Sequence, residues 1–92
     1  MAVDFITVEV KFSGKVQGVN FRRNASYVAG RYGVSGWIRN ASDGSVEACF
    51  SGPEASVMTV IKECKELPGA IVTGSEVRLV PHIDYREFSI RY

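Results

Sequence analysis

A short segment near the N-terminus combines the residue types that bind an anion. The segment runs from Gly14 to Arg22, GKVQGVNFR, between an alternating apolar stretch and a stretch with helical periodicity. Its two glycines allow the backbone to turn tightly and to approach a ligand closely. Successive backbone N–H groups in such a turn can converge on one anion, and the following helix contributes unpaired N–H groups and its positive dipole end. Arg22 would add a planar, permanently charged guanidinium that matches phosphate oxygens.

These residues alone leave two interpretations open. The segment fits neither GxxxxGK[ST] nor GxGxxG, so it indicates neither a nucleoside triphosphate site nor a dinucleotide site. One interpretation is a phosphate cradle with Arg22 as its cation. The other is a plain connection between a strand and a helix, in which the glycines make the turn and the arginines are solvated. Arg23 is turned about 100° around the helix from Arg22, and we expect it to be solvated in either case.

The segments around this loop predict an alternation of strands and helices. Apolar residues at every second position over 5–12 predict a strand with one buried face. A helical period starts at Phe21, and Gly33 suits the position just after the helix end. Asp43-Gly44 marks a hairpin turn, and Gly52-Pro53 opens a second helix that Pro68-Gly69 ends. The remaining strands are predicted at residues 34–40, 45–51, 71–80 and 88–92, with a possible bulge at Gly74.

This order of elements predicts the fold class. Strand, helix, strand, strand, helix, strand is the order of the α+β, ferredoxin-like split βαβ sandwich. Two helices, each with one apolar stripe, would cover one face of a mixed, largely antiparallel sheet, to which the C-terminal segment adds a short extra strand. In this arrangement the first and second strands are parallel and the third lies between them. With 92 residues, we expect residues 1–92 to form a single domain.

Composition excludes several classes of protein and site. Cys49 and Cys64 form no CxxC motif and His82 is the only histidine, so a zinc site lacks ligands; whether the two thiols pair stays open. We expect His82, which follows a proline, to lie at the surface. No segment approaches the roughly 20 apolar residues of a membrane helix, and the N-terminus does not resemble a signal peptide. The sequence therefore predicts a cytoplasmic protein without a membrane segment.

The charges are distributed unevenly along the chain. Residues 1–42 carry six bases and two acids, whereas residues 43–92 carry five bases and eight acids. The basic first half favours an anionic ligand, although scattered solvated charges would give the same count. The excess is too small for a nucleic-acid surface, and no strand carries the aromatic run of an RNA-binding module.

A second motif makes the interpretation of the Gly14–Arg22 segment more specific. Residues 36–47, GWIRNASDGSVE, together with GKVQGVNFR, resemble the two signature motifs of the acylphosphatase family at that family's spacing. The resemblance extends to Gly52-Pro53 and to the C-terminal residues 88–92, FSIRY. It implies the ferredoxin-like fold already indicated by the order of the elements.

The resemblance also implies an activity and a set of site residues. Acylphosphatases hydrolyse the mixed anhydride of a carboxylate and phosphate without a metal or cofactor. By matching positions, Arg22 binds the phosphate and Asn40 orients the attacking water. The backbone N–H groups that form the cradle are those of Lys15, Val16, Gln17, Gly18 and Val19.

The expected partners are small molecules. They are an acyl phosphate substrate and inorganic phosphate, which is both product and competitive ligand. We expect a monomer that binds neither nucleic acid nor membranes. The alternative is a non-catalytic anion-binding or regulatory module on the same fold, since fold alone does not imply activity. Related domains also occur inside larger carbamoyl-transfer enzymes, and this short sequence argues against that version.

Overall fold

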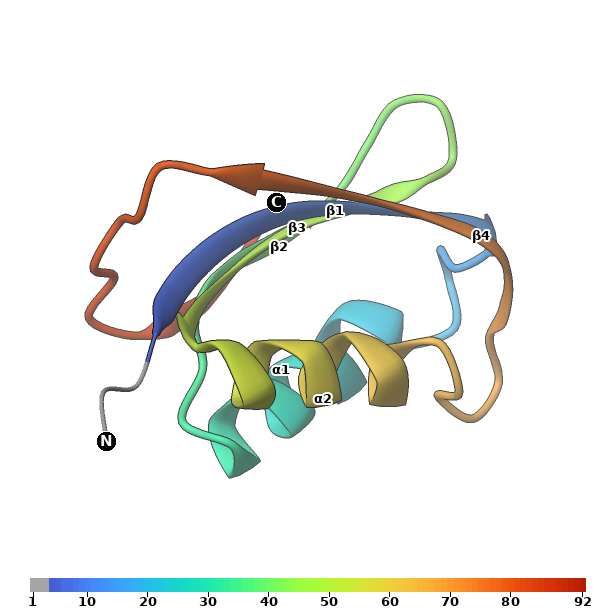
Figure 1. The fold of residues 1–92 in the computed structure, drawn as a ribbon. Helices are drawn as coiled ribbons and strands as arrows, with labels where there is room; N and C mark the ends of the chain where they lie inside the picture. The colour runs from blue at the N-terminus through green and yellow to red at the C-terminus, as the bar shows by residue number, and fades with distance from the viewer. Residues whose placement is uncertain (1–3) are drawn as a thin grey trace.

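Five strands form one sheet, and two helices cover one of its faces (Figure 1). The computed structural model describes residues 4–92. The elements along the chain are β1 (Phe5–Lys15), α1 (Phe21–Arg31), β2 (Ser35–Asn40), β3 (Val46–Pro53), α2 (Glu54–Cys64), β4 (Ile71–Val80) and β5 (Phe88–Arg91). The predicted α+β, ferredoxin-like sandwich with its extra C-terminal strand is confirmed.

The sheet has the order β4-β1-β3-β2-β5. All neighbouring strands are antiparallel except β2 and β5, which are parallel. The predicted arrangement, with β1 and β2 parallel and β3 between them, is confirmed. Because parallel strands end at the same edge of a sheet, the C-terminal ends of β2 and β5 lie next to each other. Arg39 pairs with Arg91, so Asn40 and Tyr92 occupy neighbouring positions there.

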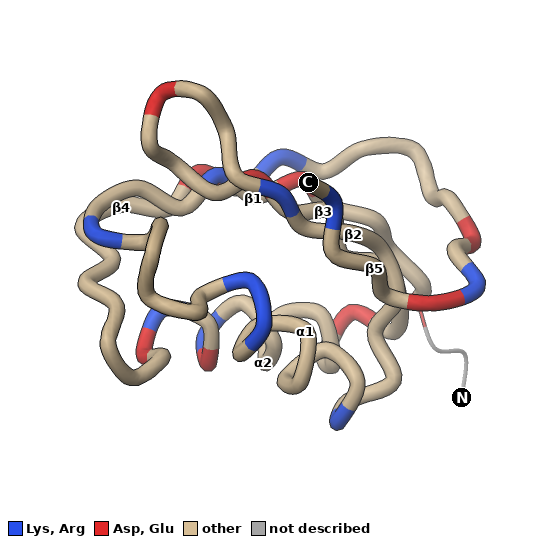
Figure 2. The backbone as a smooth tube through the Cα atoms, turned by 180° about the vertical axis from the view of Figure 1, so that it is seen from behind, with Lys and Arg blue, Asp and Glu red and all other residues tan. Residues whose placement is uncertain are grey.

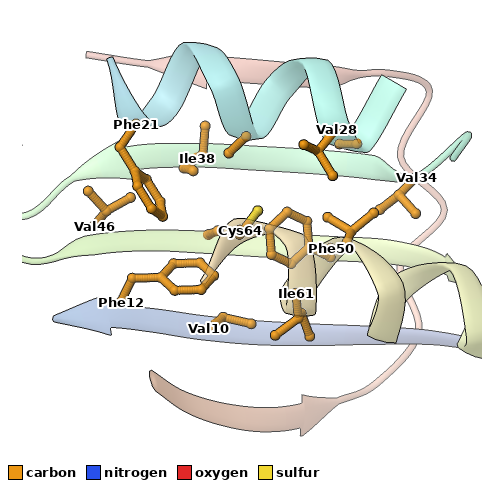
Figure 3. Packing of buried hydrophobic residues seen from close by; sticks show 14 of the residues in the cluster. Val10, Phe12, Phe21, Val28, Val34, Ile38, Val46, Phe50, Ile61 and Cys64 are labelled. Atoms are coloured by element: carbon orange, nitrogen blue, oxygen red, sulfur yellow. The ribbon is translucent and has the colours of Figure 1, made fainter. Parts of the chain in front are cut away.

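The core lies between the helices and the central strands (Figure 3). The alternation predicted for the first strand is observed, since Val8, Val10 and Phe12 are all buried. Phe12 near the end of β1 packs against Phe21 at the start of α1, with ring centroids 5.2 Å apart. This contact fixes the distance between the two elements that flank the Gly14–Arg22 segment. The buried residues of α1 are Phe21, Ala25, Val28 and Ala29, and those of α2 are Val57, Val60, Ile61 and Cys64.

Helix α1 ends as the sequence predicts. Gly33 has a φ of 67°, a left-handed conformation that glycine adopts without steric cost. Its N–H donates to Gly30 O at 3.3 Å, and Val34 N–H donates to Ala29 O at 2.9 Å. These two bonds form the Schellman motif, which satisfies carbonyls that the helix would otherwise leave unpaired.

The first strand is longer than predicted and changes the role of one glycine. β1 continues to Lys15, so Gly14 pairs with β4 instead of belonging to the loop. A Cβ at Gly14 would lie 2.2 Å from Ile71 O. The close approach of β4 therefore requires glycine at this position, whether or not a ligand binds nearby. The predicted bulge is present beside Gly74, where the register shifts between Ser13 and Gly14.

One polar residue of β1 is buried on the face that the helices leave open. Thr7 has 0% exposure, although the alternation places it on the polar face. The chain after β4 folds over this face, and Ile83 N–H donates to Thr7 Oγ1 at 2.9 Å. Ser51 Oγ donates to Ile83 O at 2.6 Å and lies 2.9 Å from Thr7 Oγ1. His82 is exposed, as expected, with its Nδ1 at 3.1 Å from Thr7 Oγ1.

The two cysteines are both free and buried. Cys49 lies on the sheet face that the helices leave open, where its Sγ donates to the Tyr85 hydroxyl. Cys64 is the last residue of α2 and belongs to the core between the helices and the sheet. Burial raises the pKa of the Cys64 thiol to about 12. Both side chains are therefore structural. Within residues 4–92, neither helix has the length and apolar character needed to cross a membrane.

Candidate active site

A pocket of about 340 Å³ lies at the N-terminal end of α1. Four segments form it: the loop after β1, the first turn of α1, the end of β2 and the end of β5. Of the predicted site residues, Val16, Gly18, Arg22 and Asn40 line this pocket. The structure thus brings the two sequence motifs together at one place. Arg23 is exposed, as expected. It also lines the pocket, which the sequence did not predict.

The other three predicted cradle residues do not line the pocket with their side chains. Lys15 is the exposed last residue of β1, and Val19 is half-buried and packs against the core. The side chain of Gln17 points toward the β2–β3 turn. For these three residues the prediction concerned only backbone N–H groups, and it stays a prediction.

Gln17 connects the two halves of the site. Its Nε2 donates to Ala41 O and to Ser45 O, each at 2.8 Å. Both acceptors belong to the turn that follows Asn40. The Gln17 side chain therefore holds the loop after β1 against the segment that carries Asn40. Sequence reasoning treated Gln17 only as a backbone donor. Its polar side chain between apolar residues was a signal, but its acceptors could not be identified without the tertiary contact.

The loop conformation leaves the helix N-terminus open to a ligand. Gly18 has a φ of 74° and a Cβ there would meet no atom within 4 Å. Asn20, the N-cap residue, adopts a left-handed conformation with a φ of 61° and makes no side-chain cap bond. The first turn of α1 contains no acidic residue. Helix N-termini ordinarily attract a capping oxygen or an acid, whereas here Arg22 and Arg23 place two positive charges beside the dipole (Figure 2).

Arg22 is held by the end of β5. Its Nη1 donates to Arg91 O at 3.1 Å, and its guanidinium carbon lies 4.9 Å from the centre of the Tyr92 ring. In the part of the chain that the structure describes, neither Arg22 nor Arg23 forms an ion pair. The half-buried Arg22 is thus oriented by neutral groups, and its charge stays available to an anion.

Asn40 precedes a turn that hydrogen bonds and an ion pair stabilise. Ala41 N–H donates to Ser45 O at 2.9 Å, and Asp43 Oδ1 accepts from Ser45 N–H at 3.0 Å and from its hydroxyl at 2.6 Å. Lys11 Nζ lies 2.8 Å from the other carboxylate oxygen of Asp43. Lys11 and Ser45 together hold the pKa of the Asp43 carboxyl well below its usual range. Because folding lowers this pKa, the contacts of Asp43 are present at neutral pH and are lost as the pH falls through the lowered pKa.

The C-terminal residues are a further part of the site that sequence reasoning missed. Ile90 and Tyr92 line the pocket, and Tyr92 contacts Arg22. The alternation over 88–92 indicated a strand, but its partner was not predicted. A prediction that this strand pairs with β2 would have placed Tyr92 beside Asn40. Among residues 4–92, no group of three His, Cys, Asp or Glu side chains lies close enough to hold a metal ion.

These features place a pocket with two arginines at an open helix N-terminus in a ferredoxin-like fold. A model of the acylphosphatase family matches residues 8–90. An acylphosphatase of Thermoplasma volcanium is 42% identical over 86 residues, which cover 92% of this chain and 96% of that relative. The chain belongs to the acylphosphatase family.

Solved structures agree with this assignment. The structure of an acylphosphatase from Coxiella burnetii has a TM-score of 0.91 and 32% identity, covering 96% of this chain and 94% of that one. The crystal structure of acylphosphatase from Bacillus subtilis has a TM-score of 0.90 and 30% identity, covering 95% of this chain and 99% of that one. The two sequence motifs that carried the resemblance therefore identified the family correctly.

Proposed function

We propose that the pocket at the N-terminus of α1 is where this member of the acylphosphatase family hydrolyses acyl phosphates to a carboxylate and inorganic phosphate. The observation that carries the proposal is the convergence of Gly18, Arg22 and Asn40 on one pocket from two distant motifs. An open helix N-terminus and two unpaired arginines match the charge of a phosphate group.

The phosphate group is held by the loop and by Arg22. The backbone N–H groups of Lys15 to Val19 surround the phosphate oxygens, and the guanidinium of Arg22 binds them as a planar fork. Arg91 O and the Tyr92 ring keep that fork in place before substrate arrives. Such preorganised donors stabilise the charge that spreads over the equatorial oxygens in phosphoryl transfer.

Asn40 orients the attacking water. The water oxygen attacks phosphorus in line with the bond to the acyl oxygen, and that bond breaks as the carboxylate leaves. An amide has no useful pKa, so Asn40 accepts a hydrogen bond from the water without taking its proton. The proton passes to a phosphate oxygen, and the products are a carboxylate and inorganic phosphate. Because a carboxylate is already a good leaving group, positioning supplies much of the required rate.

Activity in the presence of a chelator tests the proposed reaction. We expect purified protein to release phosphate from acetyl phosphate and benzoyl phosphate at the same rate with and without excess EDTA. Added inorganic phosphate should compete with the substrate, because it occupies the same cradle. A rate that disappears with EDTA and returns with a divalent cation contradicts the metal-free mechanism. Absence of turnover, with phosphate still bound, would favour the non-catalytic anion-binding module.

Gln17 is expected to act on the rate through the position of Asn40. Gln17→Leu removes two hydrogen bonds, which should lower the free energy of unfolding by about 1–3 kcal/mol. The loop and the Asn40 turn then move relative to each other, and misplacement of this kind can cost up to about a hundredfold in rate. We expect kcat for acetyl phosphate to fall at least about tenfold, measured at a temperature where the variant is fully folded.

A matched control separates this effect from lost stability. Thr59 Oγ1 donates to Ala55 O at 2.9 Å on α2, and Thr59 does not line the pocket. Thr59→Val should lower the urea midpoint slightly and leave kcat unchanged. Parental kcat in Gln17→Leu would show that the loop and the turn hold their relative positions without this side chain.

The remaining expectations concern the state of the protein. We propose that residues 1–92 act as a single domain, as a monomer in the cytoplasm, and that neither a nucleic acid nor a membrane is a partner. The single core shared by both helices and the central strands supports the first point. Sedimentation velocity at micromolar concentration would measure the mass, and cell fractionation would give the location.

A further inference from the structure

A second groove continues from the phosphate pocket along the exposed side of α1. It has a volume of about 420 Å³, and its surface is mostly apolar. Arg23 and Ile90 line both the pocket and the groove. The pocket and the groove are therefore adjacent, and the groove lies between α1 on one side and β5 on the other.

The groove follows one face of the helix. Arg23, Tyr27, Gly30 and Arg31 line it, at the spacing of neighbouring turns on one helix face. Arg23 and Gly30 are about 10 Å apart along the helix axis. The groove thus leads away from the phosphate site for a distance that an acetyl group cannot span and an extended acyl chain can.

Two residues of the groove have no function in the fold. Tyr27 is 67% exposed, a large aromatic side chain that the core does not use. Gly30 has no positive φ, and a Cβ at this position would meet no atom within 4 Å. Neither the backbone nor the packing of the fold requires glycine here, although glycine inside a helix is less favourable than alanine. The absence of a side chain at residue 30 leaves the groove open beside the helix backbone.

The charges of the groove favour a neutral chain over a second carboxylate. Arg31, at the end far from the pocket, is paired with Glu63, whose Oε1 lies 3.3 Å from Arg31 Nη1. Glu63 also accepts a hydrogen bond from the Tyr32 hydroxyl. The unpaired cation, Arg23, lies at the other end, next to the phosphate pocket.

We propose that the acyl group of the substrate lies in this groove and that the protein prefers acyl phosphates with an extended apolar acyl chain. The inference rests on the proposed function and adds the substrate class to it. The phosphate stays at the N-terminus of α1, and the chain runs over Ile90 and Tyr27 toward Gly30. The reaction is the same hydrolysis, so no additional reactant is required.

A series of straight-chain substrates tests the preference. We would measure kcat/KM for acetyl, butyryl, hexanoyl and octanoyl phosphate below their aggregation concentrations. Complete burial of a methylene would raise kcat/KM about fourfold, and the open groove gives less. We expect octanoyl phosphate to exceed acetyl phosphate by at least about tenfold, mainly through KM. Equal kcat/KM across the series overturns the proposal.

A variant that fills the groove tests its location. Gly30→Leu places a side chain in the open space and also improves helix propensity, so the variant is expected to fold. The ratio of kcat/KM for octanoyl to acetyl phosphate should fall at least fivefold. The matched control is Lys62→Leu, which adds an exposed leucine to α2 and should keep the parental ratio. A parental ratio in Gly30→Leu overturns the assignment of the groove.

The two proposals fail in different ways. If the parent protein hydrolyses no acyl phosphate of any length, the proposed function fails and the groove proposal falls with it. If acetyl phosphate is hydrolysed but the ratio is independent of chain length and of residue 30, the groove proposal alone is wrong. Tyr27→Ala supplies a further check, since removal of this wall should lower the ratio in the same direction as Gly30→Leu.

Discussion

Replacing Arg22 with alanine is expected to lower kcat/KM for acetyl phosphate by about a thousandfold. In the proposed mechanism the guanidinium supplies charge-assisted hydrogen bonds to the phosphate, and removal of a preorganised donor to a developing charge costs about 10²–10³ in rate. Lost ground-state binding adds to this, so both KM and the inhibition constant of inorganic phosphate should rise. Initial rates at varied substrate and phosphate concentrations measure both effects.

Two further variants show which property of Arg22 matters. Arg22→Lys keeps the charge but loses the planar fork, so it lacks the fixed geometry in which the guanidinium contacts Arg91 O and the Tyr92 ring and still faces the pocket. We expect it to retain only a small part of the parental kcat/KM. Arg78→Ala, which removes an exposed arginine of β4 that is paired with Glu9 of β1, controls for a general loss of charge. Near-parental activity in Arg22→Lys would show that charge alone suffices.

Asn40→Ala is expected to lower kcat by about a hundredfold or more while KM changes little. The amide aligns the water and makes no contact with the phosphate in the proposed mechanism, so its loss affects the rate and spares substrate binding. The side chain is exposed at the end of β2 and contributes nothing to the core. The melting temperature should therefore remain close to that of the parent. Steady-state kinetics and inhibition by phosphate measure the separation between rate and binding.

The control for Asn40 lies in the same turn. Ser42 is exposed and Ser42→Ala should keep the parental kcat, because Ser42 does not line the pocket. Parental kcat in Asn40→Ala would mean that another group orients the water. A rise in the phosphate inhibition constant equal to that of Arg22→Ala would instead assign Asn40 to phosphate binding.

Local patterns were sufficient to predict the strands and helices. Alternation identified β1 because Val8, Val10 and Phe12 all face one packed helix layer. The helical period identified α1, and Gly33 marked its end through a conformation that glycine adopts at no steric cost. These signals are short-range, so they survive without knowledge of the tertiary structure.

Contacts between distant segments could not be predicted in the same way. The alternation placed Thr7 in solvent, but the 81–85 segment covers it and supplies its hydrogen-bond partners. Gly14 looked like a ligand-binding glycine, whereas its small size serves the close approach of β4. In each case the residue type was informative, and only the partner from elsewhere in the chain decided its role.

The same limit applied to the site. Arg22 and Asn40 were predicted from two motifs, and the structure brings both to one pocket. Gln17 and Tyr92 were missed as side chains that position other residues. A residue that positions another side chain can be recognised only when the contact between the two is known. Its residue type alone does not indicate the role, because the effect depends on geometry.

The support of Arg22 by β5 has a consequence for how the site forms during folding. Arg22 and the carbonyl of Arg91 are separated by 69 positions in the chain. The orientation of Arg22 thus depends on a contact between distant parts of the chain, and loop closure over such a distance is entropically costly. A partly synthesised or partly unfolded chain can hold the loop and α1 without an oriented Arg22. If Arg22 acts as proposed, we expect the active site to form late, when this edge strand docks, and local opening of the strand to disrupt the site while the core remains intact.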